Sequence, residues 1–89
     1  MEHRRIHVCG RVQGVGFRWF VCELAFRNGI RGYVKNLPDG KVQILAIAES
    51  DKLRTFADQI RMGNRHCQVG SLSVDELTNY TEYEDFFIA

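Results

Sequence analysis

The sequence lacks the features that mark several broad classes of protein. None of its apolar runs approaches the roughly 18 residues that a membrane-spanning helix needs, and the charged start at residues 1–5 leads into a short strand-like stretch rather than a signal-peptide core. Twelve basic side chains stand against eleven acidic ones, so the formal net charge of the 89 residues is only +1. A general binder of nucleic acid or of membrane surfaces normally carries a strong excess of one sign. We therefore expect a single cytoplasmic domain over residues 1–89 that binds neither nucleic acid nor membrane.

Cysteine and histidine are also scarce. Cys9, Cys22 and Cys67 are widely spaced and form no Cys-x-x-Cys pair, so neither a zinc site nor a disulfide framework is indicated. We expect free thiols that are buried or half buried, and a Cys9–Cys67 disulfide stays open for an oxidising compartment. The histidines share no metal-ligand spacing, and all three are interpreted as surface or edge residues: His3, His7 and His66. No metal and no cofactor is expected.

The periodicity of the apolar side chains predicts alternating strands and helices. Residues 6–12 alternate between apolar and polar with the period of a strand, and from Phe17 the spacing becomes that of an amphipathic helix. Gly29 follows the last turn of this helix in the way that helices commonly end. Strand-like runs at 30–35 and 41–48 are joined through a Pro-Asp-Gly turn, which predicts a hairpin.

The second half of the chain repeats part of this order. Ser50 is expected to cap a second helix, with Gly63 after its last turn. A fourth strand is indicated near residues 69–74, and a short fifth strand is possible at 86–88. The order β-α-β-β-α-β, with each helix apolar on one face, predicts an α+β fold: a ferredoxin-like α/β sandwich with an antiparallel sheet and two helices on one face.

The first helix has apolar residues on two sides. Beside the stripe that begins at Phe17, a second stripe consists of Trp19, Cys22 and Phe26. Because an amphipathic helix turns its apolar residues away from water, we predict that this helix is buried over more than half of its circumference.

Residues 8–18, Val-Cys-Gly-Arg-Val-Gln-Gly-Val-Gly-Phe-Arg, carry the most information about function. They predict a strand that breaks at glycines and places an arginine in the first turn of a helix. The N–H groups of such a loop and of the helix start can bind an anion together. Gly14 and Gly16 let the backbone approach the anion without a Cβ in the way, and Arg18 adds a planar cation. The segment therefore predicts a pocket for one phosphoryl group.

This segment also resembles the first motif of the acylphosphatase family, which runs glycine, any residue, Val-Gln-Gly-Val, any residue, Phe or Met, Arg. Residues 10–18 fit it throughout. The second motif of the family is matched by Gly-Tyr-Val-Lys-Asn at residues 32–36, followed by Gly40 and Val42. The resemblance covers nearly the whole chain and implies the same ferredoxin-like fold.

The resemblance implies an enzyme that hydrolyses acyl phosphates to a carboxylate and inorganic phosphate without a metal or cofactor. Inorganic phosphate would be both product and inhibitor, and we expect a monomer. Arg18 and Asn36 would be the catalytic residues: Arg18 would neutralise the phosphoryl oxygens, and Asn36 would orient the attacking water, which an amide can do because it both donates and accepts without titrating. The implied phosphate-binding residues are Gln13, Gly14, Val15, Gly16, Phe17 and Arg18.

Other interpretations of the same residues stay open on the sequence alone. Arg18 could form a surface ion pair, and Asn36 could be an ordinary turn residue at the start of the hairpin. A related alternative is an acylphosphatase-like module for carbamoyl phosphate, as found at the N-terminus of long hydrogenase-maturation enzymes. An RNA-recognition domain shares the β-α-β-β-α-β order, but its signature fails after Arg31-Gly32-Tyr33.

The chain departs from the family pattern at two places. Ala48 stands where the second motif usually continues to a glycine, and Asn-Arg-His at 64–66 stands where the family often has Pro-Pro-Gly. We interpret the first change as a local adjustment of the backbone far from the expected phosphate loop. The second change could alter the rigidity of the loop after the second helix, but it removes no residue that is expected to act.

Overall fold

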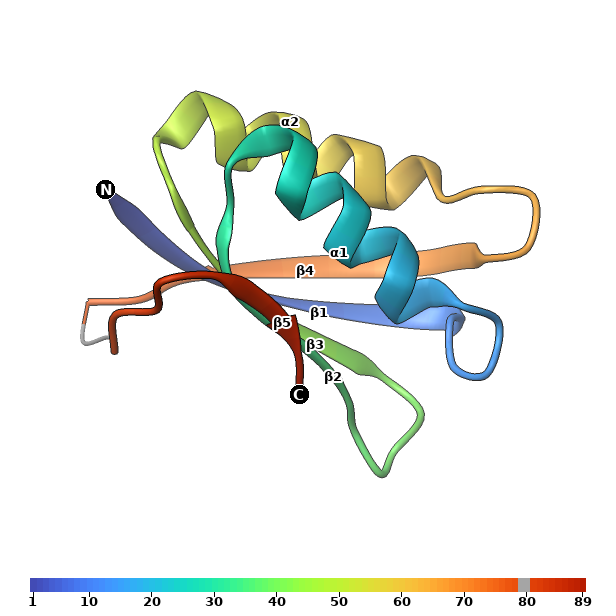
Figure 1. Cartoon of the computed structure of the whole chain (residues 1–89). Coiled ribbons are helices and arrows are strands. Elements are labelled where there is room, and N and C mark those ends of the chain that lie inside the picture. The colour runs from blue at the N-terminus through green and yellow to red at the C-terminus, as the bar shows by residue number, and fades with distance from the viewer. Residues whose placement is uncertain (79–80) are drawn as a thin grey trace.

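The computed structural model describes residues 1–78 and 81–89. Both helices lie on one side of a five-stranded sheet (Figure 1), which confirms the predicted ferredoxin-like sandwich. The elements and their bounds are β1 Glu2–Arg11, α1 Phe17–Asn28, β2 Arg31–Asn36, β3 Val42–Ala48, α2 Ser50–Met62, β4 Gln68–Glu76 and β5 Phe86–Ile88.

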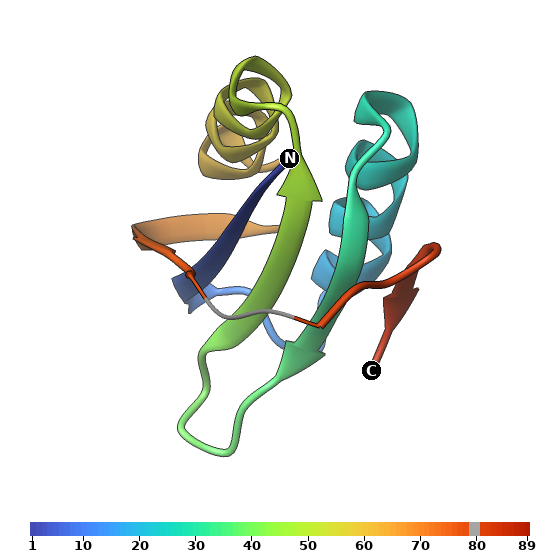
Figure 2. The ribbon, with the colours of Figure 1, turned by 90° about the vertical axis from the view of Figure 1, so that its left-hand side faces the viewer.

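The strands lie side by side in the order β4-β1-β3-β2-β5, and Figure 2 shows them in this order from left to right. Pairing is antiparallel between β1 and β3, β1 and β4, and β2 and β3. The short fifth strand, predicted as possible, is present, and it pairs parallel to β2 with Gly32 opposite Phe86. The sheet is therefore mixed, with an antiparallel centre and one parallel edge strand.

Capping explains where the helices begin and end. Gly29 adopts the left-handed conformation at φ 66° after α1, and the N–H of Ile30 donates to the carbonyl of Ala25 at 2.9 Å. The predicted start and end of α1 are both confirmed. Ser50 is not the cap of α2, because Glu49 holds that position and accepts the N–H of Leu53 on its carbonyl at 3.0 Å. Ser50 is instead the first helical residue.

The core lies between the sheet and the inner faces of both helices. α1 buries four side chains there, namely Phe17, Val21, Leu24 and Ala25. Trp19 and Phe26 point the other way and are 75% and 90% exposed, while Cys22 is half buried. The prediction that the second stripe would be covered is therefore wrong. Its cause is topological, because the sheet and α2 contact α1 from the inner side only.

His3 lies on the face of the sheet that the helices leave open, yet it is only 5% exposed. The chain after β4 returns across this face: the N–H of Leu77 donates to the carbonyl of His3 at 2.9 Å, and Glu82 and Tyr83 line a small cavity with His3 and Ile47. The interpretation of His3 as a surface residue is therefore wrong. Burial, with the nearby N-terminal charge, lowers the pKa of its imidazole below the usual value.

All three cysteines are free thiols, as expected. Cys67 is buried, and burial raises the pKa of the Cys22 and Cys67 thiols above the usual value. Within the described residues, neither helix has the length and apolar character that a membrane span requires.

His3 makes the stability of the fold depend on pH. The pKa of His3 is lower in the folded state, so as the pH falls the unfolded chain binds the proton first. The contribution of neutral His3 to the free energy of unfolding is therefore complete above the unfolded pKa of about 6.5. It is lost as the pH falls below that value. Urea unfolding between pH 8 and 5 should show stability falling through this range in the unmodified chain. The loss should be smaller in His3→Gln. His66→Gln, in an exposed loop, is the matched control; an equal effect of both variants would contradict the assignment.

Candidate active site

Three connections meet at one end of the molecule, on the right of Figure 1. They are the loop between β1 and α1, the β2–β3 hairpin, and the loop between α2 and β4. The first contains residues 13–16 and leads directly into Phe17 and Arg18, and the second begins directly after Asn36. The fold thus gathers the sequence-predicted site residues at the same end of the sheet.

Gly14 and Gly16 shape the loop before α1. Both have positive φ, 75° and 80°, and a Cβ built on either would meet no atom within 4 Å. Glycine is needed here for the left-handed backbone rather than to relieve crowding. Gly16 caps α1 without any side-chain hydrogen bond, so the N–H groups of the first helical turn remain free to bind a ligand.

Arg18 brings a positive charge to a place that is already electropositive. It lies in the first turn of α1, where the helix dipole favours acids, and this turn contains no acidic residue. Arg18 is half buried, and within residues 1–78 and 81–89 it forms no ion pair or hydrogen bond. The alternative of a surface ion pair is therefore wrong for the described residues. An anion between the guanidinium and the helix N–H groups would stabilise both.

Gln13 connects the glycine loop to the hairpin. Its side-chain Nε2 donates to the carbonyls of Leu37 and Lys41, both at 2.9 Å. The amide group of Gln13 is thus directed at the hairpin, and its backbone N–H is the part that is left to contact a phosphoryl group. Sequence reasoning missed this connection, because its acceptors are backbone groups more than twenty positions away.

The other side of the glycine loop is attached to the loop before β4. The Cys67 thiol donates to the carbonyl of Val15 at 3.5 Å. Asn64 shapes that second loop, because its Oδ1 accepts the N–H groups of His66 and Cys67 at 2.8 and 2.9 Å. The side chain of Asn64 thus closes the turn at the position where the family pattern departs. The glycine loop is held between two neighbouring segments.

Asn36 ends β2 and is half buried. Its Oδ1 is buried and accepts no hydrogen bond within the described part of the chain, which is costly unless a ligand or water supplies a donor. The hairpin does not use this side chain: Asp39 Oδ1 accepts the N–H of Lys41 at 3.0 Å and closes the turn. The alternative of Asn36 as a hairpin cap is therefore not what the structure shows.

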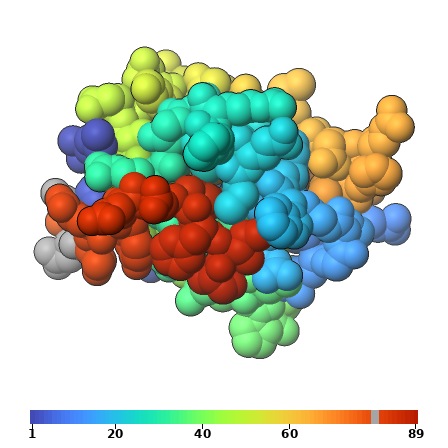
Figure 3. All heavy atoms as spheres, viewed as in Figure 1, coloured from blue at the N-terminus to red at the C-terminus, as the bar shows by residue number. Residues whose placement is uncertain are grey.

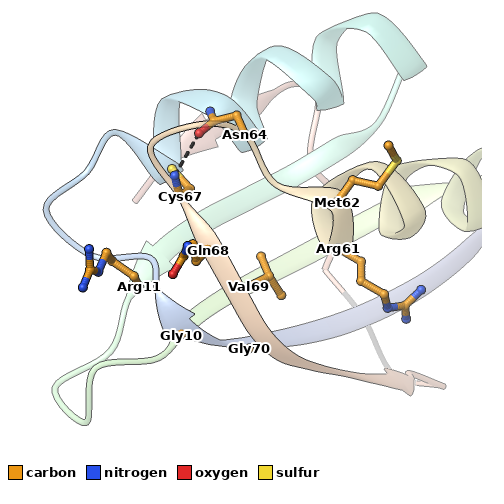
Figure 4. A pocket seen from close by; sticks show the side chains of 9 residues that line it. All are labelled: Gly10, Arg11, Arg61, Met62, Asn64, Cys67, Gln68, Val69 and Gly70. Atoms are coloured by element: carbon orange, nitrogen blue, oxygen red, sulfur yellow. Dashed lines mark hydrogen bonds between the residues drawn. The ribbon is translucent and has the colours of Figure 1, made fainter.

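A cavity of about 450 Å³, distinct from the one at His3, lies beside this end of the molecule. It contains two arginines, but Figure 4 shows Arg11 and Arg61 on opposite sides of β4 with their guanidinium groups directed away from each other. They do not converge on one anion as a phosphate site requires. No cluster of metal-ligating side chains occurs in the ranges 1–78 and 81–89.

The acylphosphatase family model matches residues 4–88. The chain belongs to the acylphosphatase family. An acylphosphatase of Archaeoglobus fulgidus is 44% identical over 81 residues, covering 89% of this chain and 91% of the relative. The crystal structure of acylphosphatase from Bacillus subtilis superposes with a TM-score of 0.95 at 39% identity, over 100% of this chain and 99% of that one. Full-length HypF, in a phosphate- and nucleotide-bound form, superposes with a TM-score of 0.84 at 28% identity, over 99% of this chain and only 12% of that one.

The family settles the class of activity. The chain is an acylphosphatase enzyme, and its family implies an acyl phosphate substrate. Since the match runs from residue 4 to residue 88, it includes the glycine loop, Arg18 and Asn36. The RNA-binding alternative is not supported.

Gln13→Ala tests whether the connection between loop and hairpin matters for activity. Losing two hydrogen bonds should lower the free energy of unfolding by about 1–3 kcal/mol. Turnover should fall by about tenfold or more, because small misplacements of positioned groups cost up to about 10² in rate. Urea unfolding and steady-state kinetics measure the two effects. Gln68→Ala, an exposed glutamine at the start of β4, should change neither, and unaltered kcat in Gln13→Ala would show that the connection is only structural.

Proposed function

We propose that this acylphosphatase hydrolyses its substrate by direct in-line attack of water on phosphorus, without a metal ion or a covalent intermediate. The observation that carries the proposal is the guanidinium of Arg18, which lies in the first turn of α1 beside the glycine loop and has no counter-charge among residues 1–78 and 81–89. A bound phosphoryl group supplies the missing negative charge. We include both Arg18 and the backbone N–H groups of residues 13–18 in the phosphate site.

Asn36 positions the attacking water in this proposal. Its buried Oδ1 accepts a hydrogen bond from the water and so fixes the oxygen in line with the bond that breaks. The water oxygen forms a bond to phosphorus, the bond from phosphorus to the acyl oxygen breaks, and the carboxylate leaves with the electron pair. Of the two protons of the water, one remains on the phosphate that forms, and the other stays there as well or passes to solvent.

This chemistry does not require a titrating side chain. A carboxylate is a weak base and leaves without protonation, and the phosphoryl transition state is loose, so positioning and charge stabilisation provide most of the catalysis. The ionisable residues beside Asn36 in the sequence are engaged elsewhere. Lys35 Nζ lies 5.6 Å from the centre of the Tyr33 ring, and Asp39 closes the hairpin turn.

Arg18→Lys tests the phosphate site. Lysine keeps the charge but loses the planar fork, so kcat/KM should fall on the order of 10² and the inhibition constant of inorganic phosphate should rise. Release of benzoate from benzoyl phosphate, with EDTA present throughout, measures both quantities. Arg11→Lys is the matched control, because Arg11 is exposed and lines the cavity of Figure 4. Parental phosphate inhibition in Arg18→Lys would exclude Arg18 from the site.

Asn36→Ala separates positioning of the water from binding of phosphate. Losing one positioned group commonly costs on the order of 10²–10³ in turnover, whereas the charge of Arg18 and the loop N–H groups remain. We therefore expect a large loss of kcat and an inhibition constant for inorganic phosphate within about twofold of the parent. Asp39→Ala, which weakens the same hairpin without touching the amide, serves as the control. Joint loss of phosphate binding and turnover in Asn36→Ala would make Asn36 a phosphate ligand instead.

A further inference from the structure

The outer face of α1 exposes large apolar side chains next to the glycine loop. Trp19 is 75% exposed and Phe26 is 90% exposed. In Figure 3 this helix faces the viewer beside β5, and no other segment that the structure describes covers its outer side. Exposed apolar surface of this kind commonly marks a place where a ligand or partner binds.

A cavity of about 750 Å³ lies along this face. It starts at the glycine loop, since Val15 and Gly16 form part of its wall, and it extends along α1 as far as Phe26. The same loop therefore borders both the proposed phosphate site and the cavity. The apolar side chains that line it are Val15, Trp19, Phe20, Cys22, Phe26 and Phe86.

The charges around the cavity favour an apolar occupant. The two charged side chains that α1 contributes to its rim, Glu23 and Arg27, pair with each other at 2.9 Å, and the other polar side chains of the wall, Asn64 and His66, come from the loop before β4. This rim thus presents no net charge from the helix. The cavity of Figure 4, in contrast, is lined by Arg11 and Arg61 and by no acidic residue, so its wall is positively charged where the α1 rim is neutral.

The expected path of the leaving group also points to the outer face of α1. In an in-line displacement the leaving group departs opposite to the attacking water. Asn36 belongs to β2 in the sheet, whereas Trp19 lies on the side of α1 that points away from the sheet. A water fixed by Asn36 thus directs the departing acyl group away from the sheet.

We infer that this cavity binds the acyl group of the substrate, with Trp19 as its main contact near the phosphate. The inference rests on the proposed function and names its substrate class: acyl phosphates with an aromatic or a medium-length aliphatic acyl group. Trp19 and Phe26 are seven residues apart, which is about 10 Å along a helix. A benzoyl ring would reach Trp19 only, and an octanoyl chain would reach Phe26 as well.

The test compares kcat/KM for acetyl, benzoyl and octanoyl phosphate. The unmodified chain should prefer the two larger substrates. Trp19→Ala should lower both the benzoyl-to-acetyl and the octanoyl-to-acetyl ratios about tenfold, the scale at which an apolar pocket discriminates. Phe26→Ala should lower the octanoyl ratio alone. Met62→Ala removes an equally exposed apolar side chain of α2, 84% exposed and outside this cavity, and should change neither ratio.

A binding measurement keeps the inference testable apart from catalysis. Trp19 is the only tryptophan, so its fluorescence should change when benzylphosphonate binds and should change much less with methylphosphonate. If Trp19→Ala hydrolyses all three substrates with the same kcat/KM ratios as the unmodified chain, the acyl site is overturned and the proposed function stands. Absence of hydrolysis of every substrate would overturn the proposed function, and equal affinity for the two phosphonates would overturn the acyl site independently.

Discussion

The site that we propose depends on a guanidinium at the beginning of a helix. The charge of Arg18 adds to the positive end of the α1 dipole, and no acidic residue of the first turn offsets it. The free protein thus holds the Arg18 charge next to the positive helix end. An anion bound between them would offset their repulsion and be attracted by both. In the proposed site, affinity for the phosphoryl group would therefore come from relief of this repulsion as well as from new hydrogen bonds. The product phosphate would gain in the same way, so the proposed site predicts inhibition by the product.

That arrangement is useful only if the surrounding backbone keeps its shape. Gly14 and Gly16 set the path of the loop, Gln13 fastens it to the hairpin, and the Cys67 thiol fastens its other side. The connection through Gln13 also fixes where the hairpin, and hence Asn36, lies relative to the loop. Since phosphoryl transfer with a good leaving group needs alignment more than acid or base chemistry, the proposed mechanism makes these neutral contacts matter for rate as well as for stability.

Local signals in the sequence predict where helices and strands lie, but they do not predict which segments pack against them. The bounds of α1 follow from Gly16 and Gly29, and the hairpin from its Pro-Asp-Gly turn. The orientation of the three-residue β5 and the burial of His3 depend on how the chain returns after β4, which no periodicity contains. Likewise the motifs predict Arg18 and Asn36 as candidate site residues, whereas the hydrogen bonds of Gln13 join groups far apart in the chain and no motif predicts them. Pattern shows which residues are apolar or polar, but packing decides what covers them.

The misassigned stripe on α1 bears on how substrates are distinguished. A helix stripe that the fold leaves uncovered exposes Trp19 and Phe26 at a continuing hydrophobic cost, and an acyl group would cover it only while substrate is bound. In the proposed site the loop, Arg18 and Asn36 would contact only the parts that every acyl phosphate shares, so they would not distinguish one substrate from another. Inorganic phosphate has no acyl group and gains nothing from α1. Under these proposals, the outer face of this helix is the part of the site that discriminates between substrates, and between substrate and product.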